Sequence, residues 1–124
     1  MAFEHSLRLR VVGRHRDGVT VACRLRPELL NGQGMVHGGV IASIADEAVW
    51  FAMRHRFGKA PSATTAELKV NYLRPIAGKR VLARAKLVRA GRTLSVGRVD
   101  LYDDGRRLAA VAVVTYIMAI PTAR

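Results

Sequence analysis

Apolar and polar residues alternate near the start of the chain. Apolar side chains recur at every second position in residues 7–11 and again in residues 19–25, with arginines among the residues between them. A period of two is typical of a β-strand with one buried face, and the Arg-Asp-Gly sequence at residues 16–18 predicts a turn that joins the two runs into a hairpin. Pro27 ends the second run, and residues 31–34 (Asn-Gly-Gln-Gly) predict a loop.

The pattern changes between residues 38 and 57. Eleven of the fourteen residues from 40 to 53 are hydrophobic, and only Ser43, Asp46 and Glu47 are polar. We predict a helix, because the segment is long for a strand and Gly58 lies where a C-terminal cap is expected. A helix that is apolar on nearly all sides must be enclosed by the rest of the protein. Two carboxylates near its middle make it unsuited to span a membrane.

After Pro61 the period of two returns. It predicts four strands, at residues 65–74, 80–90, 93–102 and 108–119. Residues 109–120 are almost wholly apolar, so we expect the last strand to be central and covered on both faces. The order of two strands, one helix and four strands predicts an α+β fold in which an antiparallel sheet wraps around one long helix.

Length and composition narrow the class of protein. With 124 residues, 50% of them hydrophobic, the chain suffices for one domain, residues 1–124, and not for a second core. The single Cys23 excludes an internal disulfide and a multi-cysteine zinc site, so we expect no metal and a reducing compartment. No signal-peptide pattern is visible, which together with Cys23 predicts a cytoplasmic protein.

The chain is strongly basic, with 21 Lys and Arg against 9 Asp and Glu and a net charge of +12. Nine cations and no acid lie in residues 69–98, where many alternate with apolar residues. The hydrated face of a sheet explains this best, and a patch for a phosphorylated small molecule comes second. A nucleic-acid surface is the weakest alternative, because the few aromatic residues are not interleaved with the cations.

The sequence His37-Gly38-Gly39 stands directly at the predicted helix start. Backbone N–H groups there have no partner within the helix, and they lie at the positive end of its dipole. They are suited to stabilise a developing oxyanion. The alternative is that the two glycines only allow tight packing against the sheet.

Asp46 lies in the most apolar segment of the chain. A carboxylate there is costly unless it is hydrogen-bonded or functional, so we expect a catalytic role, with an ion pair as the alternative. Glu47 faces about 100° away and is expected to form a salt bridge to solvent-exposed or interface groups. His37 and Asp46 are nine residues apart, on opposite faces and roughly 13 Å apart along one helix. If they act together, two chains must share the site.

The remaining candidates are expected to be structural. His5 and His15 are assigned to exposed strands, and His55 to the helix end, where it complements the dipole. Cys23 alternates with buried positions and belongs to the core. Core or dimer packing is expected for Trp50, Phe51 and Met53.

The chain resembles the hotdog-fold thioesterases of the PaaI-like (phenylacetate-pathway) type. The resemblance rests on residues 37–39 followed by Val-Ile-Ala-Ser-Ile-Ala and Asp46, and on the lead-in Pro-Glu-Leu-Leu-Asn at residues 27–31. Residues 70–75 (Val-Asn-Tyr-Leu-Arg-Pro) and 91–93 (Gly-Arg-Thr) add to it. It spans roughly residues 7–120.

The resemblance implies a role for each residue that matches the family pattern. Gly38 would offer its N–H to the thioester oxygen, and the side chain of Asn31 would support this contact. His37 would orient or polarise the same end of the thioester. Asp46 of the other subunit would be the general base or the nucleophile. A hydroxyl that positions water would be Thr65 or Thr64, depending on the direction of counting. Further substrate contacts are assigned to Gly39 and Thr64. Apart from the family pattern, we select Arg89 and Arg92 of the basic segment for the coenzyme A phosphates. The alternative role for one of Trp50, Phe51 and Met53 is to line an acyl tunnel.

These features together predict an acyl-CoA thioesterase that acts as at least a homodimer, with a tetramer as an open alternative. Coenzyme A is part of the substrate, so no cofactor is expected, and neither nucleic acid nor a membrane is an expected partner. A non-catalytic acyl-CoA-binding module and an acyl-thioester hydratase or dehydratase are the alternative functions. The identity of the acyl group, and coenzyme A against a carrier protein, stay open.

Overall fold

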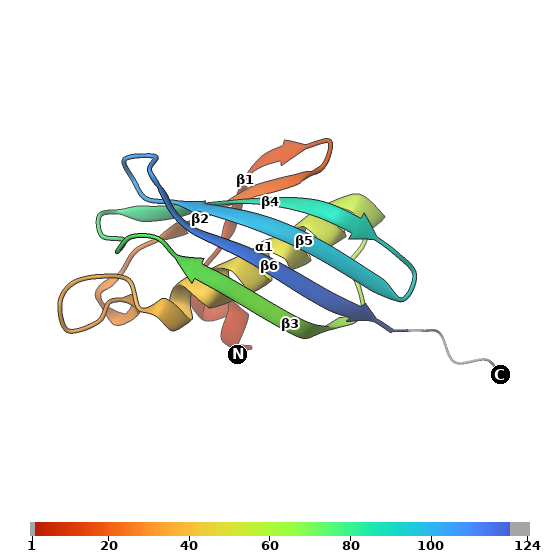
Figure 1. The fold of residues 1–124 in the computed structure, drawn as a ribbon, viewed down its shortest axis with the longest axis horizontal. Helices are drawn as coiled ribbons and strands as arrows, with labels where there is room; N and C mark the ends of the chain where they lie inside the picture. Colours follow the sequence, from red (N-terminus) through yellow and green to blue (C-terminus); the bar gives the residue numbers. More distant parts are fainter. Residues whose placement is uncertain (1, 120–124) are drawn as a thin grey trace.

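One long helix lies behind a single twisted sheet in the computed structural model, which describes residues 2–119 (Figure 1). The six strands are β1 (Arg10–His15), β2 (Gly18–Arg24), β3 (Ala63–Tyr72), β4 (Arg80–Ala90), β5 (Leu94–Tyr102) and β6 (Leu108–Met118). They form an antiparallel sheet in the order β1-β2-β4-β5-β6-β3. The helix α1 (Gly38–Phe57) and two short 3-10 helices, η1 (Phe3–Leu7) and η2 (Pro27–Leu29), complete the chain. The predicted α+β order of elements is confirmed.

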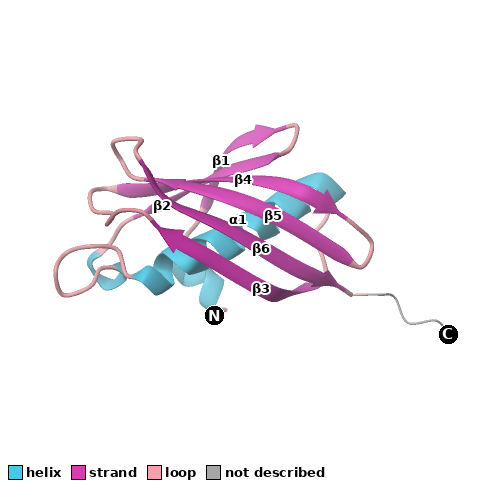
Figure 2. Ribbon diagram, in the orientation of Figure 1, coloured by secondary structure: helices cyan, strands magenta, loops and turns pink. Residues whose placement is uncertain are grey.

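The helix begins and ends at the residues that the sequence pattern predicts. His37 is the N-cap, and its Nδ1 atom accepts a hydrogen bond from the Gly39 N–H at 3.1 Å. Gly58 closes the helix in the left-handed conformation, at φ 76°, and donates its N–H to the Arg54 carbonyl. Glycine adopts that conformation at little cost, which makes it the common residue after a helix. Figure 2 shows α1 covering one face of the sheet and leaving the other uncovered.

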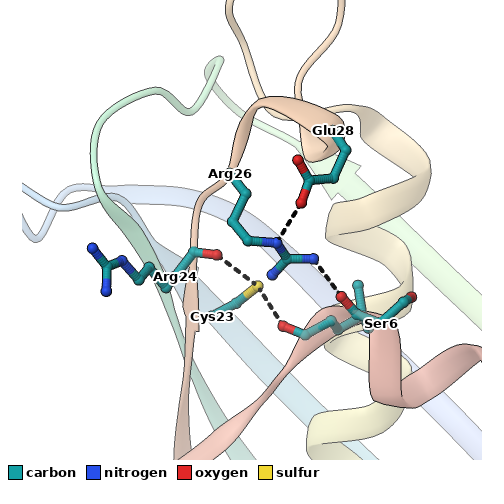
Figure 3. A network of polar contacts seen from close by, with 6 residues as sticks. Ser6, Cys23, Arg24, Arg26 and Glu28 are labelled. Atoms are coloured by element: carbon teal, nitrogen blue, oxygen red, sulfur yellow. Dashed lines mark hydrogen bonds and ion pairs between the residues drawn. The ribbon is translucent and has the colours of Figure 1, made fainter.

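The N-terminal segment differs from its prediction. Residues 7–9 were expected in the first strand, but the chain forms η1 up to Leu7 and β1 begins only at Arg10. Leu7 is buried, and its carbonyl accepts a hydrogen bond from the Cys23 thiol at 3.3 Å. Arg26 donates to the Ser6 carbonyl and pairs with Glu28 at 2.6 Å (Figure 3). These long-range bonds hold η1 against β2, which an alternating pattern does not reveal.

The last strand is also only partly as predicted. β6 lies between β5 and β3, but just one of its faces is buried, through Ala110, Ala112, Val114 and Tyr116. On the other face Val113 is 39% and Ile117 is 56% exposed. The expectation that both faces are covered was wrong for the single chain, because α1 packs against one side of the sheet only. Ile120 lies outside the described residues.

The helix approaches the sheet most closely at a glycine. Gly97 of β5 is buried, and a Cβ atom there would lie 2.6 and 2.7 Å from the two methyl carbons of Val49. Real Cβ atoms do not come that close to carbon, so a side chain at position 97 would push α1 away from the sheet. Across residues 2–119 no helix is long and apolar enough to cross a membrane.

We expect Gly97→Ala to lower the free energy of unfolding by about 1–3 kcal/mol, as overpacking of a core does. Val49→Ala removes the two methyl groups that clash, so the double variant should lose less than the sum of the two single losses. Urea denaturation of the four proteins measures this coupling. Gly32→Ala is the control, because nothing lies within 4 Å of a Cβ there. Additive losses would contradict the close approach.

Candidate active site

Asp46 is held by hydroxyl groups from two neighbouring strands. The Thr65 hydroxyl of β3 donates to Asp46 Oδ1 at 2.8 Å. The Tyr116 hydroxyl of β6 lies 2.8 Å from the same oxygen and 2.9 Å from the Asp46 carbonyl oxygen. The carboxylate is half-buried, in the middle of α1. A charged group that loses water must recover hydrogen bonds, and these two donors supply them.

A cleft of about 630 Å³ opens beside this carboxylate. Its apolar lining includes Trp50 and Phe51, which meet edge to face with ring centroids 5.3 Å apart. The Arg54 guanidinium lies 5.9 Å from the centre of the Trp50 ring, close enough for a cation–π contact. Met53, by contrast, is fully buried in the core. The cleft therefore combines a hydrogen-bonded carboxylate with an aromatic wall.

Glu47 also lines this cleft, where burial and the neighbouring carboxylates of Asp46 and Glu4 raise its pKa to about 7. It forms no ion pair with any of residues 2–119, so the expected salt bridge is not made within the single chain. The physical reason is position, since the side chain shares the cleft with Asp46 instead of facing solvent. His5 lines the same cleft from η1, and the expectation that it lies on a strand was wrong.

A second hollow, of about 360 Å³, contains two of the residues that were predicted to bind the thioester oxygen. These are Asn31 and Gly38, and Tyr72 lines the hollow beside them. Asn31 Oδ1 accepts hydrogen bonds from the main-chain N–H groups of Gln33 and Met35, at 2.9 and 3.1 Å. The Nδ2 group of Asn31 is engaged by no residue in the range 2–119. The loop is thus ordered by one end of the amide, and the other end can donate to a ligand.

The two glycines at the helix start differ in how their N–H groups are used. The Gly39 N–H is taken by the cap, whereas the Gly38 N–H has no partner among the described residues. A Cβ on Gly38 would meet only Tyr72, at 3.5 Å or more, which is an ordinary contact. Tight packing against the sheet therefore does not explain Gly38. A neutral His37 that accepts at Nδ1 carries its proton on Nε2, which can then act as a donor.

The structure does not bring Asp46 and the Gly38 group together within one chain. The two positions are eight residues apart on α1, which corresponds to about 12 Å along the helix axis. No residue lines both the cleft at Asp46 and the hollow at Gly38.

The remaining predicted residues lie at the periphery. Thr64 is exposed and lines the cleft, whereas the Thr65 side chain contacts Asp46. Arg89 and Arg92 are exposed at the end of β4 and in the following turn, outside both hollows. His15 ends β1, and its carbonyl oxygen lies 3.1 Å from His55 Nε2, so His55 ties the helix end to the hairpin.

Two features escaped the sequence interpretation. Tyr116 contacts Asp46 from a position 70 residues further along the chain, and its hydroxyl did not single it out in the sequence because Thr115 beside it carries one too. A basic hollow of about 570 Å³ gathers cations from three separate segments, so no single run of sequence reveals it. Its charged lining residues are Arg8, Arg10, Arg24, Arg26, Lys79 and Arg80. Within residues 2–119 no three metal-ligating side chains come together.

The raised pKa of Glu47 makes stability depend on pH. The stabilising contribution of Glu47 is fully present below the ordinary pKa of a glutamate, 4.5, and is lost as the pH rises through about 7. The side chain of the Glu47→Gln variant cannot ionise. The difference in free energy of unfolding, variant minus wild type, should therefore be larger at pH 8 than at pH 5. Because the side chain is partly solvated, we expect a gain on the order of 1 kcal/mol.

Chemical denaturation at the two pH values measures this difference. Glu67→Gln is the matched control, because that side chain is exposed on β3. A Glu47→Gln effect of the same size at both pH values would show that Glu47 does not ionise in this range.

Comparison with known proteins places these observations in a family. The model of the thioesterase superfamily matches residues 33–110, which include the helix, Asp46 and Gly38. The medium/long-chain acyl-CoA thioesterase YigI of Escherichia coli K12 is 29% identical over 136 residues, covering 95% of this chain and 86% of YigI.

Solved structures agree. A mutant of the phenylacetic acid degradation protein PaaI from Thermus thermophilus superposes with a TM-score of 0.80 at 28% identity, over 94% of this chain and 98% of PaaI. The thioesterase HI1161 from Haemophilus influenzae shares the fold at a TM-score of 0.83 and 21% identity, over 91% of this chain and 79% of that one. The predicted hotdog fold and the resemblance to PaaI-like proteins are confirmed, and the chain belongs to the thioesterase superfamily.

Proposed function

We propose that this protein hydrolyses acyl-CoA thioesters to a carboxylic acid and free coenzyme A. The observation that carries the proposal is the Asp46 carboxylate, held by two hydroxyl groups beside a cleft, in a chain of the thioesterase superfamily. YigI, which aligns with almost the whole chain, is named a medium/long-chain acyl-CoA thioesterase. Coenzyme A enters as part of the substrate, so no cofactor is proposed. The buried, free Cys23 suits a cytoplasmic location.

Asp46 either takes a proton from a water molecule that attacks the carbonyl carbon, or attacks that carbon directly to form an acyl anhydride that water then hydrolyses. In both routes the C–S bond breaks, coenzyme A leaves and is released as the thiol, and negative charge develops on the carbonyl oxygen. Both routes need a carboxylate on one side of the carbonyl group and N–H donors on the other. The Gly38 N–H at the positive end of the α1 dipole stabilises that charge. Nδ2 of Asn31 adds a donor to the same hollow, since the loop contacts use only Oδ1 of that side chain. Nε2 of His37, at the N-cap, is a further candidate donor, because the cap uses only Nδ1.

A complete site on this proposal requires two copies of the chain. Asp46 and Gly38 lie at different hollows about 12 Å apart along one helix, so the carbonyl group cannot contact both in a single chain. An isologous dimer places Asp46 of each subunit against Gly38 of the partner subunit and forms two equal sites. β3 is an edge strand of the described sheet, and unpaired edges are common places for a second chain to add.

Two groups of basic side chains are candidates to bind the coenzyme A phosphates. Arg89 and Arg92 remain candidates because they are exposed and unpaired with acids among residues 2–119. The hollow lined by Arg10, Arg24 and Lys79 is a second candidate, with a larger concentration of charge. Guanidinium groups bind phosphate oxygens in pairs, which suits either position.

Asp46→Asn should reduce kcat on acyl-CoA thioesters by about 10²–10⁴-fold, the usual contribution of a positioned acid–base group. A panel of aryl and fatty acyl-CoA substrates, followed by thiol release, measures the loss. Asp100→Asn is the control, because that carboxylate lies on the opposite side of the sheet from α1 in β5.

Equal rates in wild type and Asp46→Asn would remove Asp46 from the mechanism. A wild-type protein that binds acyl-CoA tightly in calorimetry and hydrolyses none of the panel would be a binding module instead.

Complementation tests the shared site. Asn31→Asp keeps the oxygen that orders the loop and removes the amide donor, so alone it should be nearly inactive, as should Asp46→Asn. When the two variants are co-expressed, each heterodimer contains one site with both native halves. Random pairing then restores about a quarter of the wild-type sites. A mixture as inactive as its components would show that each site lies within one chain.

A further inference from the structure

The two oxygens of the Asp46 carboxylate have different surroundings. Oδ1 accepts hydrogen bonds from both Thr65 and Tyr116, at 2.8 Å each. Oδ2 accepts none from any of residues 2–119. One oxygen is therefore anchored by the protein, and the other is left for a molecule that enters the cleft.

We propose that Tyr116 is a positioning residue that anchors Asp46 through Oδ1 and so presents Oδ2 as the reacting oxygen. This inference rests on the proposed thioester hydrolysis, and it assigns to Tyr116 a function that it exerts through Asp46. Two further features of the fold support it, the alignment of the two hydroxyl groups and the burial of the phenol.

The sheet register aligns the two donors. Thr65 of β3 and Tyr116 of β6 are direct cross-strand partners, so both side chains project from the same face toward α1. The register shifts immediately after this pair, between Thr65 and Glu67. Such a bulge bends the strand and re-aims its side chains, and bulges are frequent next to active sites. The irregularity in β3 thus falls at the place where the carboxylate is held.

The Tyr116 phenol is suited to donate and not to titrate. Its side chain is only 3% exposed, and burial, together with the Asp46 charge, raises its pKa above the ordinary value. It therefore stays protonated throughout the range in which the enzyme works. The hydroxyl also contacts the Asp46 carbonyl oxygen, at 2.9 Å. One rigid group thus touches both the main chain and the side chain of Asp46 and restricts the rotation of the carboxylate.

A purely structural role would be different in its consequences. A tyrosine that only satisfied its own hydroxyl in the core would affect stability and leave the chemical step unchanged. A tyrosine that orients Asp46 and stabilises its anion affects kcat and the pH at which activity appears, because a lost donor makes the ionised carboxylate less favourable.

Tyr116→Phe tests the inference, with Tyr102→Phe as the matched control because no hydrogen bond is formed by the Tyr102 hydroxyl within residues 2–119. We expect Tyr116→Phe to lower kcat by roughly 10- to 100-fold, the effect of one hydrogen bond to a charged group, with KM within about twofold of the wild type. The acidic limb of its pH–kcat profile should move to higher pH. Unchanged kcat and an unchanged limb in a folded Tyr116→Phe protein would overturn the inference.

A second variant covers the case in which Tyr116→Phe does not fold. Incorporation of 3-fluorotyrosine at position 116 keeps the ring and makes the hydroxyl a stronger donor, so the acidic limb should move to lower pH. A limb that stays in place would again overturn the inference. Asp46→Asn separates this result from the proposed function. If Asp46→Asn is inactive while both Tyr116 variants behave as wild type, the inference about Tyr116 is rejected and the proposed function of Asp46 still stands.

Discussion

The packing of α1 against one face of the sheet is the contact on which the rest of the molecule depends. The helix reaches β5 so closely that only a glycine fits opposite Val49, and residues along its length, such as Ile44 and Met53, are fully buried. This contact fixes the position of Asp46 relative to β3 and β6. The Asp46 carboxylate loses part of its hydration in the half-buried cleft. The hydrogen bonds from Thr65 and Tyr116 compensate that loss.

The same helix separates the two halves of the chemistry. Its N-terminus carries an unused N–H group at Gly38 and its middle carries the carboxylate, and a rigid helix cannot fold back to join them. On the proposed mechanism, this separation means that a second copy of the chain would be required to complete the site. The proposed mechanism also gives a reason for a glycine at position 38, where a Cβ would make only ordinary contacts, since a bare backbone leaves room for a carbonyl group to approach.

Local patterns predicted most of the fold. The start of the helix was readable from the change of hydrophobic pattern near Gly38, and its end from Gly58, because a C-terminal cap depends on a conformation that glycine adopts readily. Three strands kept their predicted limits to within a residue or so, because alternation follows directly from a buried face. η1 was missed because long-range bonds from Cys23 and Arg26 hold it, and β6 was misjudged because an apolar run does not say how many faces are covered.

For the site, the sequence by itself determined that Asp46 and the glycine-rich helix start belong to one helix and lie more than two turns apart. Spacing along a regular helix is sufficient for that conclusion. Only the tertiary structure decided which hydroxyl groups meet Asp46, because Thr65 and Tyr116 become neighbours through strand pairing across 51 residues of sequence. It also decided that Glu47 shares the cleft, since the environment of a side chain depends on what packs around it and not on its own position in the chain.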